Sequence, residues 1–237
     1  MHFVLLFLIN MFNYLKNRKY TTQKINKIYS QYLYTGFHGM LMRYCHRQLE
    51  SKLPDKKFKK ILEIGAGSEP HFSYIKNKDF IYFILEKTKQ GSPIKKIKSK
   101  NFFYKYYDGK KIPFKQNSFD RVILSHTLEH IPDPEPFIKN VMKILKKNGV
   151  LSISLPADPG LFYRISRMMN KIFLFNKQLR ISAIEYDYSN AIEHINSIFN
   201  LVNIIRYNYK KRVTESFLPF KVKLIDLNLF YNVHIVK

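Results

Sequence analysis

The stretch Ile61-Leu62-Glu63-Ile64-Gly65-Ala66-Gly67-Ser68 decides the fold of this chain. Its first four residues form a short, largely apolar run of the kind found in buried strands, and glycines follow at once. Glycine lets the backbone turn tightly and come close to a ligand. The stretch therefore predicts a strand that ends in a tight turn, a helix after the turn, and a ligand bound beside it.

The residue three positions after Gly67 indicates whether the turn suits a dinucleotide. Dinucleotide-binding proteins carry a third glycine there, in a loop that cradles pyrophosphate. This chain has Pro70 at that position. NAD and FAD are therefore disfavoured, and Pro70 suits the first turn of the expected helix instead.

Carboxylates follow the next two apolar runs. Glu86 follows the run 80–85, and Asp108-Gly109 follows the run 102–107. Because ligands bind at the carboxyl ends of parallel strands, we expect both side chains in one crevice. Glu86 can accept hydrogen bonds from ribose hydroxyls, and Asp108 can meet the amine of adenine. Carboxylates that accept hydrogen bonds, without a loop that cradles phosphate, suit S-adenosylmethionine as the ligand. The alternative is that the strand-end Glu and the Asp-Gly turn are ordinary surface features.

Two further apolar runs, 121–124 and 150–155, flank an amphipathic helix expected over 134–147. Strands that alternate with helices predict right-handed βαβ units and a parallel sheet. Outside this part of the chain, the pattern predicts helices at 41–53, 161–175 and 183–199, and strands at 201–207 and 229–236.

Several of these motifs together resemble those of class I S-adenosylmethionine-dependent methyltransferases. The motifs are Glu63-x-Gly65-x-Gly67, Glu86, Asp108, Ile112-Pro113-Phe114, Asn117 to Val122, Ser125 to Asp133 and Leu145 to Leu151. The resemblance covers residues 58–160. It implies an α/β fold, with a Rossmann-like, doubly wound, seven-stranded sheet that is mostly parallel, an antiparallel last strand, and N-terminal helices.

The resemblance also implies a site and an activity. The implied cofactor-binding residues are Glu63, Gly65, Ala66, Gly67, Glu86, Lys87, Asp108, Gly109, Ser125 and His126. Glu63, Gly65 and Gly67 would shape the methionine end of the pocket. Glu86 would bind the ribose, and Asp108 would bind the adenine. The implied reaction is transfer of a methyl group to an O, N or C atom of a small molecule or of a sugar- or lipid-linked intermediate.

His126 and His130 are the candidate catalytic residues. On one helical turn they would share a face, and either could act as a base; a packing role is the alternative. We expect Glu193, His194 and Tyr163 on the acceptor side. No metal is expected, because the two histidines lack an evident third ligand.

The N-terminal part of the chain reads as a helical extension over 1–57, before a methyltransferase domain over 58–237. Residues 3–12 are apolar apart from Asn10, but a spanning helix needs ~20 apolar residues. No basic residue precedes them, so we reject a signal peptide. The expected location is the cytoplasm, with peripheral contact to the inner face of the membrane as an option. Met11 and Met40 are alternative starts.

The formal net charge is +24, from 41 Lys and Arg against 17 Asp and Glu. This excess fits either a lysine-rich composition or attraction to an anionic partner. An RNA methyltransferase is therefore the alternative function, although no Arg-rich or aromatic-interleaved stripe supports it. A non-catalytic protein that binds S-adenosylmethionine or a membrane surface is a further alternative. The single cysteine, Cys45, excludes a disulfide framework within the chain and a multi-cysteine zinc site.

Overall fold

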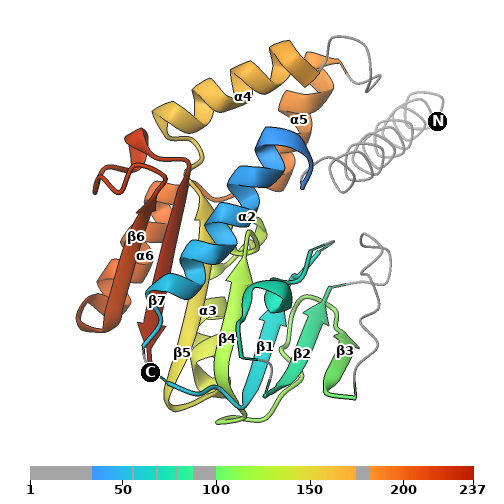
Figure 1. The fold of residues 1–237 in the computed structure, drawn as a ribbon, viewed down its shortest axis with the longest axis vertical. Helices are drawn as coiled ribbons and strands as arrows, with labels where there is room; N and C mark the ends of the chain where they lie inside the picture. The colour runs from blue at the N-terminus through green and yellow to red at the C-terminus, as the bar shows by residue number, and fades with distance from the viewer. Residues whose placement is uncertain (1–33, 55, 68, 78, 88–99, 175–181) are drawn as a thin grey trace, which may run out of the picture.

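The computed structural model describes residues 34–54, 56–67, 69–77, 79–87, 100–174 and 182–237. A seven-stranded sheet forms its centre, in the order β3-β2-β1-β4-β5-β7-β6 (Figure 1). The strands are β1 (Lys60–Ile64), β2 (Ile81–Glu86), β3 (Phe102–Tyr106), β4 (Phe119–Ser125), β5 (Leu145–Pro156), β6 (Val213–Leu218) and β7 (Phe230–Val236). The α-helices are α2 (Gly36–Ser51), α3 (Pro134–Ile144), α4 (Leu161–Leu174), α5 (Ala183–Glu193) and α6 (Ile198–Tyr209).

The sheet changes direction of winding between β1 and β4. The chain runs from β1 outward to β3 and then returns to β4 on the other side of β1, with all these neighbours parallel. Strand β7 runs antiparallel to both β5 and β6. This topology confirms the predicted Rossmann-like fold. In open sheets of this kind, ligands bind outside the carboxyl ends of the strands where the winding reverses, here β1 and β4, and we call this place the crevice.

The core lies on both faces of the sheet. On one face, Phe137 and Val141 of α3 and Leu201 of α6 pack against buried residues of β4 and β5. On the other face, Leu49 of α2 joins the cluster around Ile61 of β1. Each fully buried Leu, Val or Phe side chain contributes about 1.5–3 kcal/mol. Apolar packing therefore fixes the strand ends that carry the polar site.

Helix α2 is held to the sheet by a buried ion pair. Glu50 of α2 lies 2.6 Å from the guanidinium of Arg121 and 2.7 Å from the ring of His71, and Arg121 also donates to Ser152 at 2.9 Å. Burial alone would raise the pKa of Glu50, but the His71 hydrogen bond and the Arg121 charge outweigh it and lower this pKa to about 2. Removing one partner of such a pair costs about 3–5 kcal/mol.

The C-terminal third of the chain differs from the sequence prediction. The expected strand at 201–207 is part of α6, and the expected helix at 183–199 ends at Glu193. Ser197 caps α6, because its hydroxyl accepts the Asn200 N–H at 3.2 Å. The apolar residues of α6 therefore follow helical spacing rather than the alternation of a strand. Strand β6 was not predicted.

The helix expected after the glycine turn is also shorter than predicted. Among the described residues between Pro70 and β2, a 3-10 helix of 4 residues, His71–Tyr74, is the one helical segment. Other 3-10 helices lie at Leu128–His130, Lys210–Arg212 and Ile225–Leu227.

Helices α4 and α5 lie at the end of the sheet where β4 and β5 finish, and α2 crosses one face of it (Figure 1). Among the described residues, no helix has the length and apolarity needed to cross a bilayer. The apolar residues 3–12 lie outside the described residues, so their membrane contact stays a prediction. The division of the chain at residue 57 also stays a prediction.

Candidate active site

The turn after β1 has a backbone that favours glycine at two positions. Gly65 has φ +73° and Gly67 has φ +58°. A Cβ on Gly65 would lie 2.7 Å from the Thr127 side chain, whereas a Cβ on Gly67 would meet no described atom within 4 Å. The Thr127 hydroxyl donates to the Ile64 carbonyl at 3.0 Å. Thr127 therefore holds one side of the turn, and the other side is open around Gly67.

Glu63 lies beneath this turn. It is buried, and its carboxylate accepts the His71 N–H at 3.0 Å and the Tyr82 hydroxyl at 2.7 Å. Burial raises the pKa of Glu63 to about 7, against the effect of these hydrogen bonds. Glu63 thus connects β1 and β2 to the segment that leaves the turn, so its position fits a role in shaping the pocket.

Glu86, at the end of β2, is joined to the same turn. Its Oε1 accepts the Gly67 N–H at 3.0 Å. Burial raises the pKa of Glu86, and the N–H groups of Gly67 and Ala66 oppose that effect. This contact brings a carboxylate from β2 to the open side of the turn, where the resemblance expects a ribose.

Asp108 and Gly109 follow β3 in an exposed turn. Asp108 Oδ1 accepts the Lys110 and Lys111 N–H groups at 2.8 and 3.2 Å, and these bonds lower the pKa of the carboxyl. Gly109 has φ +82°, and a Cβ there would lie 2.8 Å from the side chain of Lys87, which follows β2. Lys87, Asp108 and Gly109 therefore lie together at the outer end of the crevice.

The residues after β4 form the next wall. Ser125 is buried, and His126 donates its backbone N–H to Ser154 of β5 at 2.9 Å. His126 has φ +51°, which is uncommon for a residue with a side chain. Its ring packs edge-on against Phe230, with centroids 5.6 Å apart. Burial lowers the pKa of His126 to about 3, so the ring is neutral at pH 7.

The two candidate catalytic histidines do not share a helical turn. The 3-10 helix spans Leu128–His130, and His126 precedes it in a non-helical conformation. Even so, both rings approach Glu129, with nitrogen–oxygen distances of 3.9 Å for His126 and 3.8 Å for His130. Glu129 was not among the residues that the sequence predicted for the site, and it lies close to both rings. Its position beside His130, four residues after the buried strand β4, was the signal.

The expected acceptor-side residues meet His130. His130 Nδ1 donates to the Glu193 carbonyl at 2.7 Å, and the rings of His130 and His194 have centroids 5.2 Å apart. His194 Nδ1 lies 2.7 Å from Asp158 Oδ2. The structure thus brings residues from the ends of β4, β5 and α5 to one place.

Tyr163 of α4 reaches this group through an arginine. The Arg167 guanidinium lies 5.6 Å from the centre of the Tyr163 ring and donates to Asp158 Oδ1 at 3.2 Å. Burial raises the pKa of the Tyr163 hydroxyl. Tyr163 therefore stays protonated at neutral pH.

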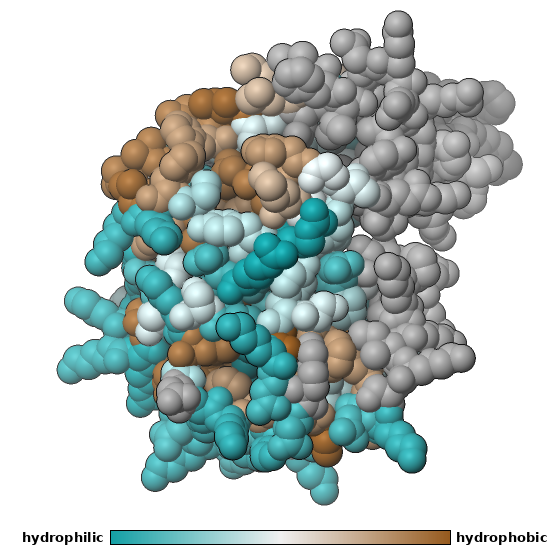
Figure 2. All heavy atoms as spheres, viewed as in Figure 1, coloured by the Kyte–Doolittle hydropathy of each residue, from teal (hydrophilic) through white to brown (hydrophobic). Residues whose placement is uncertain are grey.

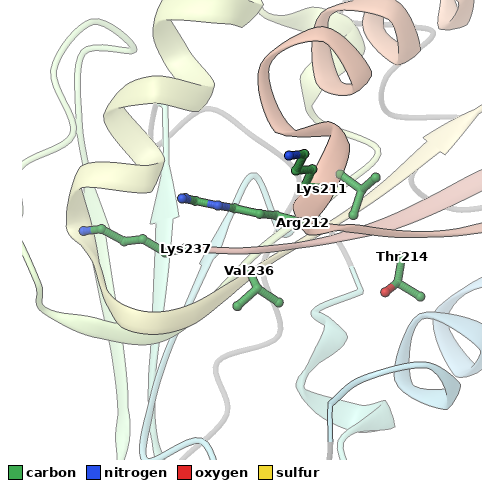
Figure 3. A pocket seen from close by; sticks show the side chains of 6 residues that line it. Lys211, Arg212, Thr214, Val236 and Lys237 are labelled. Atoms are coloured by element: carbon green, nitrogen blue, oxygen red, sulfur yellow. The ribbon is translucent and has the colours of Figure 1, made fainter.

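A hollow at the opposite edge of the sheet has a different character. It lies where β6 begins and β7 ends, far from the glycine turn, and is lined by Lys211, Arg212, Val213, Thr214, Val236 and Lys237 (Figure 3). Lys237 donates to the carbonyl of Lys143 at 3.3 Å. This hollow is no part of the crevice at the carboxyl strand ends.

The donor set of the crevice fits S-adenosylmethionine. Gly67 leaves space beside the backbone, and carboxylates mark the ends of two consecutive strands, with Glu86 at the end of β2 and Asp108 after β3. Carboxylates suit ribose hydroxyls and an adenine amine, and a dinucleotide would also need the third glycine of a pyrophosphate cradle, where this chain has Pro70. Glu86 and Asp108 would hold the nucleoside, and the backbone around Gly65 and Gly67 would hold the methionine end.

Comparison with known proteins agrees with this site. Residues 62–153 match a family model described as a methyltransferase domain. No curated protein matches the chain. A solved methyltransferase from Thermotoga maritima, described as dependent on S-adenosylmethionine and as a possible histamine N-methyltransferase, is 18% identical. It has a TM-score of 0.57 and covers 92% of this chain and 99% of its own.

Other similar structures were solved with the cofactor or its product. The plantazolicin methyltransferase, bound to a substrate analogue and S-adenosylhomocysteine, is 15% identical with a TM-score of 0.59, covering 95% of this chain and 91% of its own. The phosphoethanolamine N-methyltransferase 2 of Haemonchus contortus, bound to S-adenosylmethionine, is 14% identical with a TM-score of 0.55, covering 90% and 59%. At these identities the likeness shows the fold, and residues 62–153 match a methyltransferase domain. The chain thus carries a methyltransferase domain within the fold of S-adenosylmethionine-dependent methyltransferases.

Proposed function

We propose that this methyltransferase acts on an O, N or C atom of a small molecule or a sugar- or lipid-linked intermediate, and that the acceptor carries an apolar part. The observation that carries this proposal is an exposed apolar surface next to the crevice. We call it the apolar rim. Its members on α4 are Leu161, Ile165, Met168 and Met169, and its members in the β6–β7 connection are Phe220, Val222 and Leu224.

The rim is continuous between these two segments. The Leu161 N–H donates to Asp226 Oδ1 at 3.0 Å, and the rings of Phe162 and Phe220 have centroids 5.6 Å apart. Apolar residues spaced at 161, 165, 168 and 169 share one face of a helix. Figure 2 shows hydrophobic side chains gathered over this end of the molecule.

Exposed apolar surface of this kind supports an apolar ligand. Met168 is 56% exposed and Phe220 is 55% exposed. Soluble proteins rarely expose large contiguous apolar patches unless the patch binds something. An acceptor with an apolar part could lie on the rim while its reacting atom enters the polar crevice.

The polar residues of the crevice have separate expected roles. Bound S-adenosylmethionine supplies a methyl group on a positively charged sulfur. Methyl transfer from such a donor depends mainly on positioning, and a base is needed only if the acceptor must lose a proton. We assign positioning of the cofactor to Glu86 and Asp108, and we place His130, His194 and Tyr163 on the side of the crevice where the acceptor binds.

The test supplies the full chain with S-adenosylmethionine labelled on its methyl group, together with cell extract divided into lipid, small-molecule and RNA fractions. Label in the lipid or small-molecule fraction supports the proposal. Glu86→Ala should reduce the transfer about tenfold or more at limiting S-adenosylmethionine, whereas Glu135→Ala, at an exposed carboxylate on α3, should leave it unchanged. Label that enters RNA would overturn the proposed acceptor class in favour of the RNA alternative.

The apolar part of the acceptor has its own test. Met168→Glu places a charge on the rim without touching the cofactor side. We expect transfer to the preferred fraction to fall at least about tenfold, because a charge on a surface that buries apolar ligand atoms must be desolvated. Unchanged transfer would contradict a role for the rim.

A further inference from the structure

Three potential metal ligands from two distant segments meet beyond β4. Glu129, His130 and His194 each contribute a ligand atom, and these atoms lie within 4.8 Å of one another. Glu129 Oε1 is 3.8 Å from His130 Nε2. No third ligand beside the two histidines is evident from sequence, and no metal was expected for that reason. In the structure His194, which directly follows α5, is such a potential ligand.

Both histidines have their other ring nitrogen already occupied. The Glu193 carbonyl can only accept, so His130 Nδ1 carries the proton and Nε2 is left with its lone pair. The Asp158 carboxylate does the same for His194 at 2.7 Å. Histidines that bind metals are usually oriented in this way, by a carbonyl or carboxylate on the second nitrogen.

Glu129 lacks the partner that a buried carboxylate needs. Its side chain is 3% exposed, and Oε2 has no hydrogen-bond partner among the described residues. Among the described residues, the basic side chains within 4.0 Å of the Glu129 carboxylate are His126 and His130. A buried carboxylate oxygen without a partner is costly, and a bound cation would remove that cost.

We propose that Glu129, His130 and His194 bind a divalent transition-metal ion. Two imidazoles and a carboxylate suit Zn²⁺, Mn²⁺ or Co²⁺ better than Mg²⁺ or Ca²⁺, which prefer oxygen ligands. Ligands at ~2.1 Å from a tetrahedral ion lie ~3.4 Å apart, so the cluster would contract by roughly 1 Å on binding.

Three protein ligands leave a coordination position open. The open position would lie close to the cofactor turn, because Thr127, which packs on Gly65, is two residues before Glu129. We infer that the position takes an oxygen of the acceptor and orients it in the crevice. This role rests on the proposed function, whereas metal binding by the three side chains does not.

The experiment titrates Zn²⁺ into the full chain after treatment with EDTA, and follows binding by calorimetry. Visible absorption of added Co²⁺ reports its coordination geometry. The variants are Glu129→Gln, His194→Ala and Asp158→Asn. Glu135→Gln is the matched control, because it makes the same change at an exposed carboxylate of α3. Circular dichroism verifies that each variant is folded.

We expect one Zn²⁺ per chain in the wild type and in Glu135→Gln. Glu129→Gln and His194→Ala should each lower the affinity for Zn²⁺ at least about 100-fold. Asp158→Asn should lower it about 10–100-fold, because the Asp158 carboxylate orients the His194 ring. Absence of binding, or equal binding in all variants, would overturn the proposed site. His194 is partly exposed, so His194→Ala decides the question if Glu129→Gln does not fold.

The two proposals fail in different ways. Metal binding without methyl transfer to any fraction contradicts the proposed function and leaves the metal site standing. Methyl transfer that persists in EDTA, by a chain that binds no metal, overturns the metal site and leaves the proposed function standing.

Discussion

The two sides of the crevice hold their polar side chains in different ways. On the cofactor side, Glu86 and Asp108 accept backbone N–H groups from nearby turns, and each follows its own strand. On the acceptor side, Glu129 is buried and His126 is partly buried, and each has a side-chain atom with no hydrogen-bond partner among the described residues. His194, which lies close to Glu129, comes from a distant segment. The cofactor side is thus complete without a ligand, whereas the acceptor side has polar groups that a ligand would complete.

The largest expected effect on the cofactor side comes from Gly65→Ala. A left-handed backbone costs a residue with a side chain roughly 1–2 kcal/mol, and overpacking against Thr127 adds roughly 1–3 kcal/mol. We expect the turn to shift and the affinity for S-adenosylmethionine, measured by calorimetry, to fall about 100-fold or more. Gly67→Ala meets no described atom, so its effect should be roughly tenfold, from the backbone cost alone. Equal effects of the two substitutions would contradict the role of Thr127.

The pH dependence of stability tests the buried carboxylate under the turn. The pKa of Glu63 is raised from its ordinary 4.5 to about 7, so the unfolded chain releases this proton at lower pH than the folded chain. Its contribution to the free energy of unfolding is full below pH 4.5 and is lost as pH rises toward 7, by up to roughly 3 kcal/mol.

Urea unfolding between pH 4.5 and 8 measures this dependence. Glu63→Gln cannot ionise, so its stability relative to the wild type should increase across that range. Parallel curves for the wild type and the variant would show that Glu63 has an ordinary pKa in the folded chain.

Glu86→Gln tests the strand-end carboxylate that the turn already binds. A hydrogen bond to a charged group contributes roughly 1.5–3 kcal/mol. We expect the affinity for S-adenosylmethionine to fall about 10–100-fold, with the fold unchanged. Glu135→Gln is the control, and a similar loss there would point to a general effect of charge.

Asp108→Asn should have the smallest effect. The carboxyl group is exposed, and asparagine keeps an oxygen that can accept the Lys110 and Lys111 N–H groups. We expect a loss of roughly threefold in cofactor affinity, since exposed charges contribute little. A loss as large as that of Glu86→Gln would show that the outer end of the crevice is closed when the cofactor binds.

The cofactor side could be predicted from sequence because its geometry is local. The run 61–64 with Gly65 and Gly67 indicates the turn, and Glu86 directly follows its own strand. The carboxyl ends of parallel strands lie at one edge of a sheet. The order of the motifs along the chain was therefore enough to predict that the glycine turn and Glu86 lie close together. The strand order of the sheet confirms that prediction.

The acceptor side could be predicted only in part. His194 reaches His130 because α5 ends at Glu193, and no local pattern shows where that helix returns to the sheet. His126 was expected on a helical turn with His130, but its φ of +51° places it outside a helix, and no local pattern indicated this. In α6, the β-branched and aromatic residues suggested a strand, and packing of Leu201 and Ile205 on the sheet outweighed that preference.

The central claim is that the two sides of the crevice act separately, and calorimetry with S-adenosylmethionine tests it most directly. Wild type, Glu86→Ala and His194→Ala are titrated under the same conditions. The account predicts binding by the wild type, a loss of about 10-fold or more in Glu86→Ala, and affinity within about twofold of wild type in His194→Ala. No binding by the wild type, or equal weakening in both variants, would contradict it.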